Sequence, residues 1–296
     1  MTSRIWTALC ALDLLRQLHL YHLAYVDDHD EADRVYRGFC DKVLELAGQP
    51  PLHGIAAARC LGHSWLTLCA LLQQASSHYA RFRQNTPGAG GFPTVFVTGD
   101  LMTKGSDFAN GGIYHHLSRH GNHVLVEPAC DFFEFLARVH PHLIYGRGSG
   151  RIQNAIYTAS QFRIRKQLCE LVLPQHPWLP RPDVRAVLQK TQQVLDLSTN
   201  GGAVLAVGSA LHHWDQGYFD GLVTTACWGC DNGLITESLL RHRRDIPAYY
   251  FYDDATPIDE RRLHSFAFRL RNSERSRPEA SGVPGNNRLG TVSERF

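Results

Sequence analysis

Apolar residues recur at helical spacing through the first third of the chain. The pattern predicts amphipathic helices over residues 5–24, 33–47 and 55–84. The segment Pro87-Gly-Ala-Gly-Gly91 then interrupts the periodicity, because proline and glycine disfavour the continuation of a helix. We therefore expect a helical N-terminal region over residues 1–86 and a domain boundary at this break.

Short apolar strands alternate with helices after the break. The strands are expected at residues 94–98, 122–127, 203–207, 221–226 and 248–252. The helices are expected at residues 112–120, 152–172, 183–197 and after Gly233. Such alternation is typical of a parallel sheet covered by helices. The sequence thus predicts an α/β domain over residues 87–271, with an open, mainly parallel, Rossmann-like sheet beside the helical N-terminal layer.

The last segment, residues 272–296, is rich in Ser, Arg, Pro, Gly and Asn and has few apolar residues. Such a segment buries too little apolar surface to offset the entropy lost on folding. We therefore expect a disordered C-terminal tail.

Composition limits the possible functions. The 296 residues carry a formal net charge of +2, with 44% hydrophobic and 10% aromatic residues, as in a folded globular protein. The near-neutral charge and the lack of a basic stripe interleaved with aromatic residues give no electrostatic case for nucleic acid. Asp13 and Arg16 interrupt the first apolar run, so we expect no signal peptide. No apolar stretch reaches the length needed to cross a bilayer, so we expect no membrane-spanning segment.

Eight cysteines are scattered along the chain without the dense spacing of a secreted disulfide scaffold. A reducing compartment suits free thiols of this kind, so the sequence predicts a cytoplasmic protein. Cys40, Cys60 and Cys69 lie in the helical region, at positions more often filled by core packing than by ligands.

Cys227 and Cys230 stand where the strand expected at 221–226 meets the following helix. The next three residues, Asp231-Asn232-Gly233, are a candidate capping group for that helix. Unpaired backbone N–H groups and the positive end of the helix dipole stabilise a thiolate at such a junction. We therefore expect both thiols to ionise more easily than a buried structural cysteine. The thiolate is the form that binds a metal or attacks a disulfide.

Three interpretations of this Cys-x-x-Cys remain open. The pair could ligate a metal or an iron–sulfur cluster, since thiolates two residues apart can share one centre. It could be a redox dithiol, although Pro247 follows too closely to be the distant proline of a thioredoxin fold. Finally, two small thiols could simply pack in a tight turn, because a single Cys-x-x-Cys is a weak signal.

The loop from Gly99 to Asn110 follows the strand expected at 94–98. Open parallel sheets bind ligands at the carboxyl ends of their strands, so the polar residues of this loop are candidates for a site. Within it, Lys104 is a candidate phosphate contact and Asn110 a candidate hydrogen-bonding group for substrate. The alternative for Asn110 is that it caps the helix beginning near Gly112.

Two further patterns favour structural interpretations. His116 and His120 have the i,i+4 spacing of metal ligands, but the acidic residue of an H-E-x-x-H motif is lacking, which favours a solvated surface. The glycine-rich segment at 145–151 could bind phosphate before a helix. It fits neither nucleotide-binding motif, which favours a plain flexible loop.

Several short motifs together resemble the acyl-CoA dehydratase activase-related proteins, relatives of the 2-hydroxyglutaryl-CoA dehydratase system. In the C-terminal half they are Gly202-Ala-Val-Leu-Ala-Val-Gly208, Asp220-Gly221, Gly229-Cys230, Gly233, Asp245-Ile-Pro247 and Asp253. Further back they are Gly99-Asp100, Asp107-Phe-Ala-Asn110, Asp13-Leu-Leu15 and Tyr25. The resemblance covers most of residues 5–270.

The resemblance implies an iron–sulfur component. In that family the cysteine that opens the corresponding helix is thought to ligate a [4Fe-4S] cluster, and Cys230 occupies its position. Cys227 is then a possible second ligand. The implied partners are an activator ATPase subunit or a dehydratase subunit, and the implied substrate is an acyl-CoA. Because no upstream ATPase motif is found, the chain alone is expected neither to hydrolyse ATP nor to dehydrate a CoA ester.

The chain departs from the family pattern at several positions. Asp231-Asn232 replaces the usual Met-Pro after the cysteine, and Cys227 stands where proline is common. Leu23-Ala-Tyr-Val26 replaces Arg-Pro-Tyr-Glu. A cluster needs about four thiolate ligands, or three with an open iron site. A thiol–disulfide redox protein and a degenerate, non-catalytic relative therefore remain the alternatives.

Overall fold

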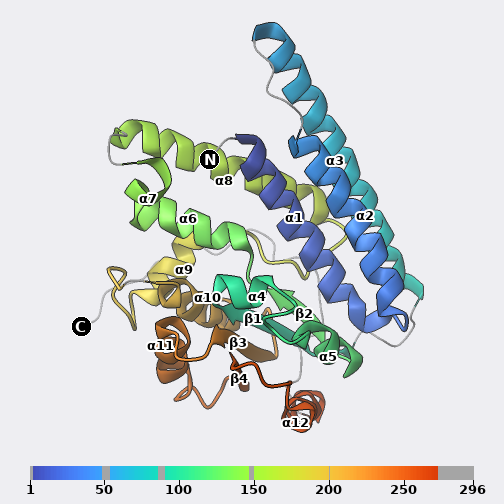
Figure 1. Cartoon of the computed structure of the whole chain (residues 1–296), viewed down its shortest axis with the longest axis vertical. Coiled ribbons are helices and arrows are strands. Elements are labelled where there is room, and N and C mark those ends of the chain that lie inside the picture. The colour runs from blue at the N-terminus through green and yellow to red at the C-terminus, as the bar shows by residue number, and fades with distance from the viewer. Residues whose placement is uncertain (1–2, 49–53, 86–90, 147–149, 200, 273–296) are drawn as a thin grey trace, which may run out of the picture.

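A computed structural model describes residues 3–48, 54–85, 91–146, 150–199 and 201–272. The expected tail therefore lies outside the described residues except for residue 272, and most of the Pro87–Gly91 break and the middle of the 145–151 segment lie outside them as well. The described chain contains one open sheet with helices on both faces and a layer of long helices beside it (Figure 1). This arrangement confirms the predicted α/β, Rossmann-like class with a helical layer.

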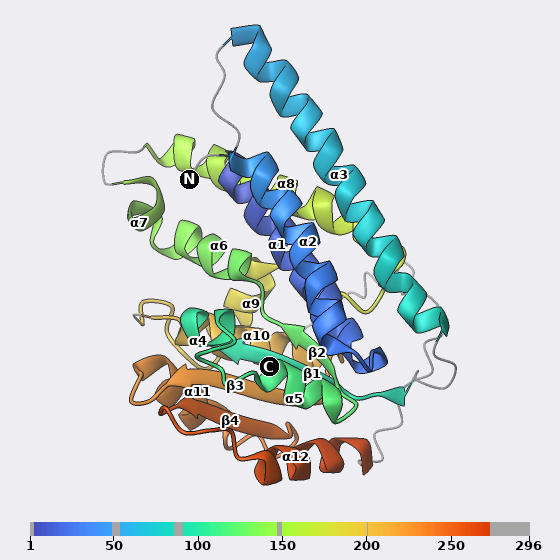
Figure 2. The same ribbon diagram turned by 45° about the vertical axis from the view of Figure 1, so that its right-hand side comes forward.

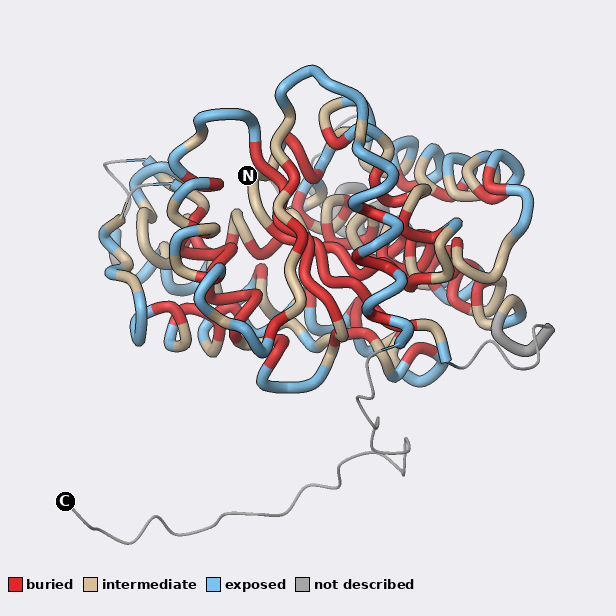
Figure 3. Tube along the Cα trace, turned by 90° about the horizontal axis from the view of Figure 1, so that it is seen from below, coloured by how far each residue is buried: buried red, intermediate tan, exposed pale blue. Residues whose placement is uncertain are grey.

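Four parallel strands form the sheet in the order β2-β1-β3-β4 (Figure 2). Their bounds are β1 (Thr94–Gly99), β2 (His123–Val126), β3 (Gly221–Cys227) and β4 (Ala248–Asp253). The central strand β1 pairs Val97 with Val126 of β2 and with Val223 of β3. The strands β1, β2 and β3 are buried on both faces, as Figure 3 shows at the centre of the molecule, which explains their nearly continuous apolar sequences.

Side chains alternate between two cores because successive residues of a strand point to opposite faces. Val95 and Val97 pack on the face covered by α5 (Ile113–Arg119) and α12 (Glu260–Asn272). Phe96 packs on the other face, against α10 (Ala203–Asp215). That second face also receives Leu240 at the end of α11 (Asp231–Leu240). Helices thus cover both faces of the sheet.

The layer of long helices has its own core. It is built from α1 (Ser3–His22), α2 (His29–Gly48), α3 (Gly54–Asn85) and α8 (Arg151–Val172). The short 3-10 helix η1 (Leu23–Tyr25) follows α1. Leu168 and Cys169 of α8 are buried against Leu15 and Leu72 of the first helices. The layer is therefore not confined to the N-terminal region, because a helix from the middle of the chain completes it.

Several elements were not predicted from the sequence. They are α4 (Leu101–Gly105), α6 (Ala129–Val139), α7 (Pro141–Tyr145) and α12. The helix expected at 183–197 is present as the shorter α9 (Val184–Thr191). Asp183 caps α9 by accepting the Ala186 N–H at 3.0 Å, which explains where this helix begins.

The prediction of a strand at residues 203–207 is wrong, because these residues begin the helix α10. All residues from Ala203 to Leu211 are buried. A helix that is enclosed on every side has no polar face, so its sequence shows no helical periodicity and resembles a buried strand. No helix in the described part of the chain combines the length and apolar character needed to cross a membrane.

Candidate functional site

The chain reverses its direction of travel across the sheet between β1 and β3. After β1 it moves to β2 on the face covered by α5, whereas after β2 it passes to β3 and then β4 with α10 and α11 on the opposite face. In open parallel sheets, the carboxyl ends of the two strands at such a reversal frame the crevice that binds ligands. Here those ends are Gly99-Asp100 and Cys227.

The end of β1 approaches β3 so closely that only glycine fits. Gly99 has φ of 126°, and a Cβ at this position would collide with the Thr225 carbonyl oxygen. The Asp100 N–H then donates to that same oxygen at 2.7 Å. The Asp100 carboxylate accepts the Thr103 N–H at 2.8 Å and so caps α4. The chain is thereby fixed at the switch point of the sheet with a carboxylate near Cys227 at the end of β3.

Cys227 and Cys230 are the first and fourth residues of a β-turn. The Cys230 N–H donates to the Cys227 carbonyl oxygen at 3.2 Å, and Gly229 supplies the positive φ, 73°, at the third position. Such a turn brings the outer Cα atoms within about 7 Å. A disulfide spans about 4.4–6.8 Å between Cα atoms, so the turn holds the two cysteines at a separation suited to one. Cys227 is exposed and Cys230 half-buried, and both are free thiols.

Cys230 is the N-cap residue of α11, which begins at Asp231. The expected capping group Asp231-Asn232-Gly233 therefore lies inside the helix, and the cap makes no side-chain hydrogen bond. Gly233 allows the first turn of α11 to lie against the sheet, since a Cβ there would meet Ala226 Cβ at 2.5 Å. The Cys230 sulfur thus lies at the positive end of a helix that is packed closely onto β3.

The pKa of the Cys227 thiol is shifted upward from its ordinary value. Partial burial is the main cause, followed by the hydrogen bond and charge interaction with Cys230 and by the negative charge of Asp100. Cys130 and Cys169, in contrast, are buried structural thiols, and burial raises the pKa of Cys169 to about 11.

The thiol pair is not part of a complete metal site within the described ranges. No three His, Cys, Asp or Glu side chains there lie together as the ligands of a metal ion would. Cys40 and Cys69 are half-buried in the helical layer, and the side chain of Cys60 lies outside the described residues. Any cluster bound by Cys227 and Cys230 would therefore need further ligands from elsewhere.

Lys104 lies at the same edge of the sheet but is enclosed by protein. Its ammonium group forms a buried ion pair with Glu127, the residue that follows β2. The Lys104 carbonyl oxygen accepts hydrogen bonds from Arg16 Nη2 at 2.8 Å and from the Tyr114 hydroxyl at 2.6 Å. Because Glu127 pairs with its charge, Lys104 connects α4 to the residue that follows β2.

Asn110 is fully buried below the start of α5. Its Oδ1 atom accepts the Gly112 N–H at 3.0 Å, and Gly112 is the N-cap residue of α5. The side chain thus stabilises the turn that leads into the helix without being its N-cap residue, which is Gly112. Trp228 was not among the site residues predicted from the sequence. It lies between the two cysteines with 73% of its surface exposed. A large exposed aromatic residue inside a Cys-x-x-Cys was the signal available.

His116 of α5 and His120, the residue that follows this helix, lie near α12. His116 Nδ1 lies 3.5 Å from Glu260, and the ring of His120 lies 5.1 Å from that of His264. Burial and the neighbouring cations lower the pKa of His120, which favours the neutral ring. These contacts tie α5 to α12.

Comparison of the chain with protein-family models, curated proteins and solved structures gives no match in any of the three. The resemblance to the acyl-CoA dehydratase activase-related proteins therefore rests on the quoted motifs alone. Fold and site together define the chain as a parallel α/β protein with a paired thiol at the switch point of its sheet.

Proposed function

We propose that Cys227 and Cys230 form a thiol–disulfide redox site. The observation that carries the proposal is the β-turn that places one exposed and one half-buried free thiol close together at the switch point of the sheet. The site requires no residue from another molecule, whereas a [4Fe-4S] cluster would require about two more thiolates. In a cytoplasmic setting, which we propose for this protein, the dithiol would be the resting state.

The proposed reaction transfers two electrons from the dithiol to a disulfide substrate. Cys230 Sγ, at the positive end of α11, attacks one sulfur of the substrate as a thiolate, and the other substrate sulfur leaves as a thiolate. Cys227 then loses its proton to water and attacks Cys230 Sγ. This step forms the Cys227–Cys230 disulfide and releases the second substrate sulfur as a thiolate. The substrate is reduced, the pair is oxidised, and water supplies the protons for the released thiolates.

The exposed ring of Trp228 is our reason for proposing that the substrate disulfide belongs to a polypeptide. Its ring packs edge-to-face on Tyr252 at 5.9 Å, so it is held in place although most of its surface is exposed. Phe108 and Met102, in the segment after β1 at the same edge, are also exposed. Exposed aromatic residues around a reactive centre favour contact with a protein surface.

The test is a thiol count after equilibration with oxidised glutathione, together with iron and sulfide analysis of protein purified without oxygen. The wild-type chain should lose two thiols, with the new disulfide found in the peptide that contains Cys227 and Cys230. Cys227→Ser and Cys230→Ser should form no intramolecular disulfide in this turn. Cys69→Ser, a half-buried cysteine of α3, is the matched control and should behave as the wild type.

Two outcomes would overturn the proposal. If the wild-type turn stays reduced while other cysteines oxidise, the pair is a structural element. If the protein contains stoichiometric iron and sulfide that Cys230→Ser abolishes, the pair is an iron–sulfur ligand set, completed by a partner such as an activator ATPase subunit or a dehydratase subunit.

A further inference from the structure

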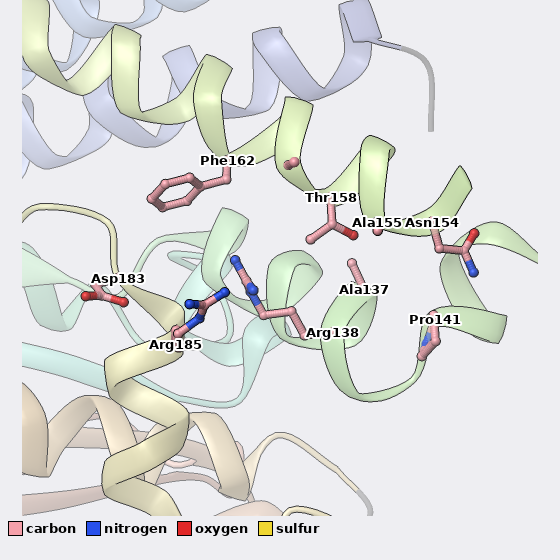
Figure 4. A pocket seen from close by; sticks show the side chains of 10 residues that line it. Ala137, Arg138, Pro141, Asn154, Ala155, Thr158, Phe162, Asp183 and Arg185 are labelled. Carbon is pink, nitrogen blue, oxygen red and sulfur yellow. The ribbon is translucent and has the colours of Figure 1, made fainter. Parts of the chain in front are cut away.

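A cavity of about 700 Å³ lies between three helical segments distant from one another in sequence. The end of α6 and the start of α7 form one side, α8 forms the opposite side, and the start of α9 closes one end (Figure 4). Sites for small organic molecules typically measure about 300–1,000 Å³, so the cavity has a suitable size. None of its lining residues belongs to β1, β3 or α11, and the cavity is therefore separate from the thiol turn.

Most of the lining is apolar. Ala155 and Phe162 of α8 face Ala137 of α6 and Pro141 of α7 across the cavity (Figure 4). The small side chains of alanine leave the space open, and the Phe162 ring offers a flat apolar surface. A lining of this kind favours a ligand with an apolar body.

Two arginines bring positive charge into the same space. Figure 4 shows the guanidinium groups of Arg138, from α6, and Arg185, from α9, directed into the cavity. Arg138 is held in position by Glu134, which accepts its Nη2–H at 2.8 Å and its Nε–H at 3.3 Å. Glu134 is almost fully buried and also pairs with the buried Arg165 at 3.1 Å. One carboxylate is thus shared between two guanidinium groups.

Arg185 has no carboxylate partner in the part of the chain that the structure describes. The nearest acid in the sequence, Asp183, also lines the cavity, and its carboxylate accepts the Ala186 N–H as the cap of α9. Two guanidinium groups directed into one cavity repel each other, and an anion between them reduces this repulsion. Arginine presents a planar set of donors that matches the two oxygens of a carboxylate or a phosphate.

We propose that this cavity binds a small organic oxyanion, a carboxylate or a phosphate ester, with an apolar body. The oxyanion lies between Arg138 and Arg185, and the apolar body lies along α8 against Phe162. Thr158 and Asn154, also on α8, supply polar groups on the side of the cavity opposite the helices that carry the two arginines. This site is independent of the proposed redox chemistry and would bind its ligand whether the thiol pair is reduced or oxidised.

The test uses three eight-carbon probes that differ only in their head group: octanoate, octyl phosphate and 1-octanol. Isothermal titration calorimetry on the full chain should show saturable binding of at least one of the two anions and much weaker binding of the alcohol. Arg185→Ala should weaken binding of the anion by about tenfold or more, since it removes a charge-assisted contact. Ala155→Phe should also weaken binding, because it fills the cavity without changing its charge. Stronger binding of octanoate or of octyl phosphate identifies the preferred head group.

Arg163→Ala is the matched control, because Arg163 is an exposed arginine of α8 that does not line the cavity. It removes the same charge and should leave the affinity unchanged. The proposal is overturned if no anion binds, if 1-octanol binds as well as the tighter-binding of the two anions, or if Arg185→Ala and Arg163→Ala have equal effects. Binding that survives both Arg185→Ala and Ala155→Phe would place the probe at another apolar surface and would likewise overturn it.

Discussion

At the scale of single residues, buried charge determines what the edge of the sheet can do. Lys104 and Glu127 are both almost fully buried and pair with each other where β1 and β2 end. Taking two charges out of water costs free energy that their attraction only partly returns, so such a pair contributes more to positioning than to net stability. Removing one partner is different, because the other charge then remains buried without compensation.

We therefore expect Lys104→Met to lower the free energy of unfolding by about 3–5 kcal/mol. The double variant Lys104→Met/Glu127→Leu should recover most of this loss, because no buried charge is left unpaired. Urea unfolding of the two single variants and the double variant gives the coupling free energy directly. Additive losses in the double variant would show that the two side chains contribute independently, through packing alone.

The raised pKa of Cys227 predicts its reactivity. Because burial, Cys230 and Asp100 all disfavour its thiolate, alkylation by iodoacetamide should reach half its maximal rate at a higher pH than for a cysteine in a short peptide. Cys230→Ser should shift that midpoint to lower pH, since it removes the neighbouring thiol. Mass spectrometry of the alkylated peptide over a pH series measures both. A midpoint unchanged by Cys230→Ser would mean that the two sulfurs do not interact.

At the scale of elements, the four strands that form the sheet were predictable because each is a short apolar run between turn residues. The long helices of the first third were predictable from their periodicity. The helix α10 was not, because it is buried on all sides. The thiol turn was located correctly between β3 and α11. The proximity of Asp100 to Cys227 depends on β1 lying beside β3, and strand order cannot be read from local pattern.

The contact between α9 and α10 depends on Gly208. A Cβ at this position would collide with Thr191 Oγ1 and would lie 2.6 Å from the Val187 carbonyl oxygen. We expect Gly208→Ala to lower the free energy of unfolding by about 1–3 kcal/mol, although alanine favours a helix, because the two helices must separate. Gly38→Ala in α2 meets no atom within 4 Å and should instead stabilise the protein by up to about 1 kcal/mol. Urea unfolding of both variants would show opposite signs, and a stabilising Gly208→Ala would contradict the packing argument.

At the scale of the whole molecule, α1 joins the helical layer to the sheet. Leu15 and Leu18 lie in the core of the layer, whereas Leu20, in the last turn, packs with Val97 and Ile113 in the core beside the sheet. A helix that serves two cores is apolar on several sides. The cavity between α6, α8 and α9 also belongs to this scale, since it exists only when helices distant in sequence pack together.

Three histidines and one aspartate form a series of contacts at the junction between the helical layer and the sheet. His19 Nε2, in α1, lies 2.9 Å from Asp33 of α2, and the second oxygen of Asp33 lies 3.5 Å from His115 Nε2 of α5. His115 Nδ1 in turn lies 3.1 Å from His29 Nδ1. Burial, the largest cause, lowers the pKa values of His19 and His29, and the charge interaction with His115 adds to the effect. Asp107 and Asp33 oppose the shift for His19, whereas Arg119 reinforces it for His29.

These directions determine how stability should change with pH. A histidine whose pKa is lowered by folding binds fewer protons in the folded chain than in the unfolded chain near the ordinary value of about 6.5. Its full contribution is therefore present above that value and is lost as the pH falls from about 7.5 to 5. Burial also lowers the pKa of His213 to about 4, so the wild-type dependence of stability on pH includes groups outside the junction.

His29→Gln and His19→Gln isolate the junction, because glutamine stays neutral, and each variant should lose less stability than wild type over this range. His242→Gln, an exposed position, should keep the wild-type slope. Urea unfolding at pH 7.5, 6.0 and 5.0 measures the slopes, and identical slopes for His29→Gln, His19→Gln and wild type would show that the junction does not respond to pH.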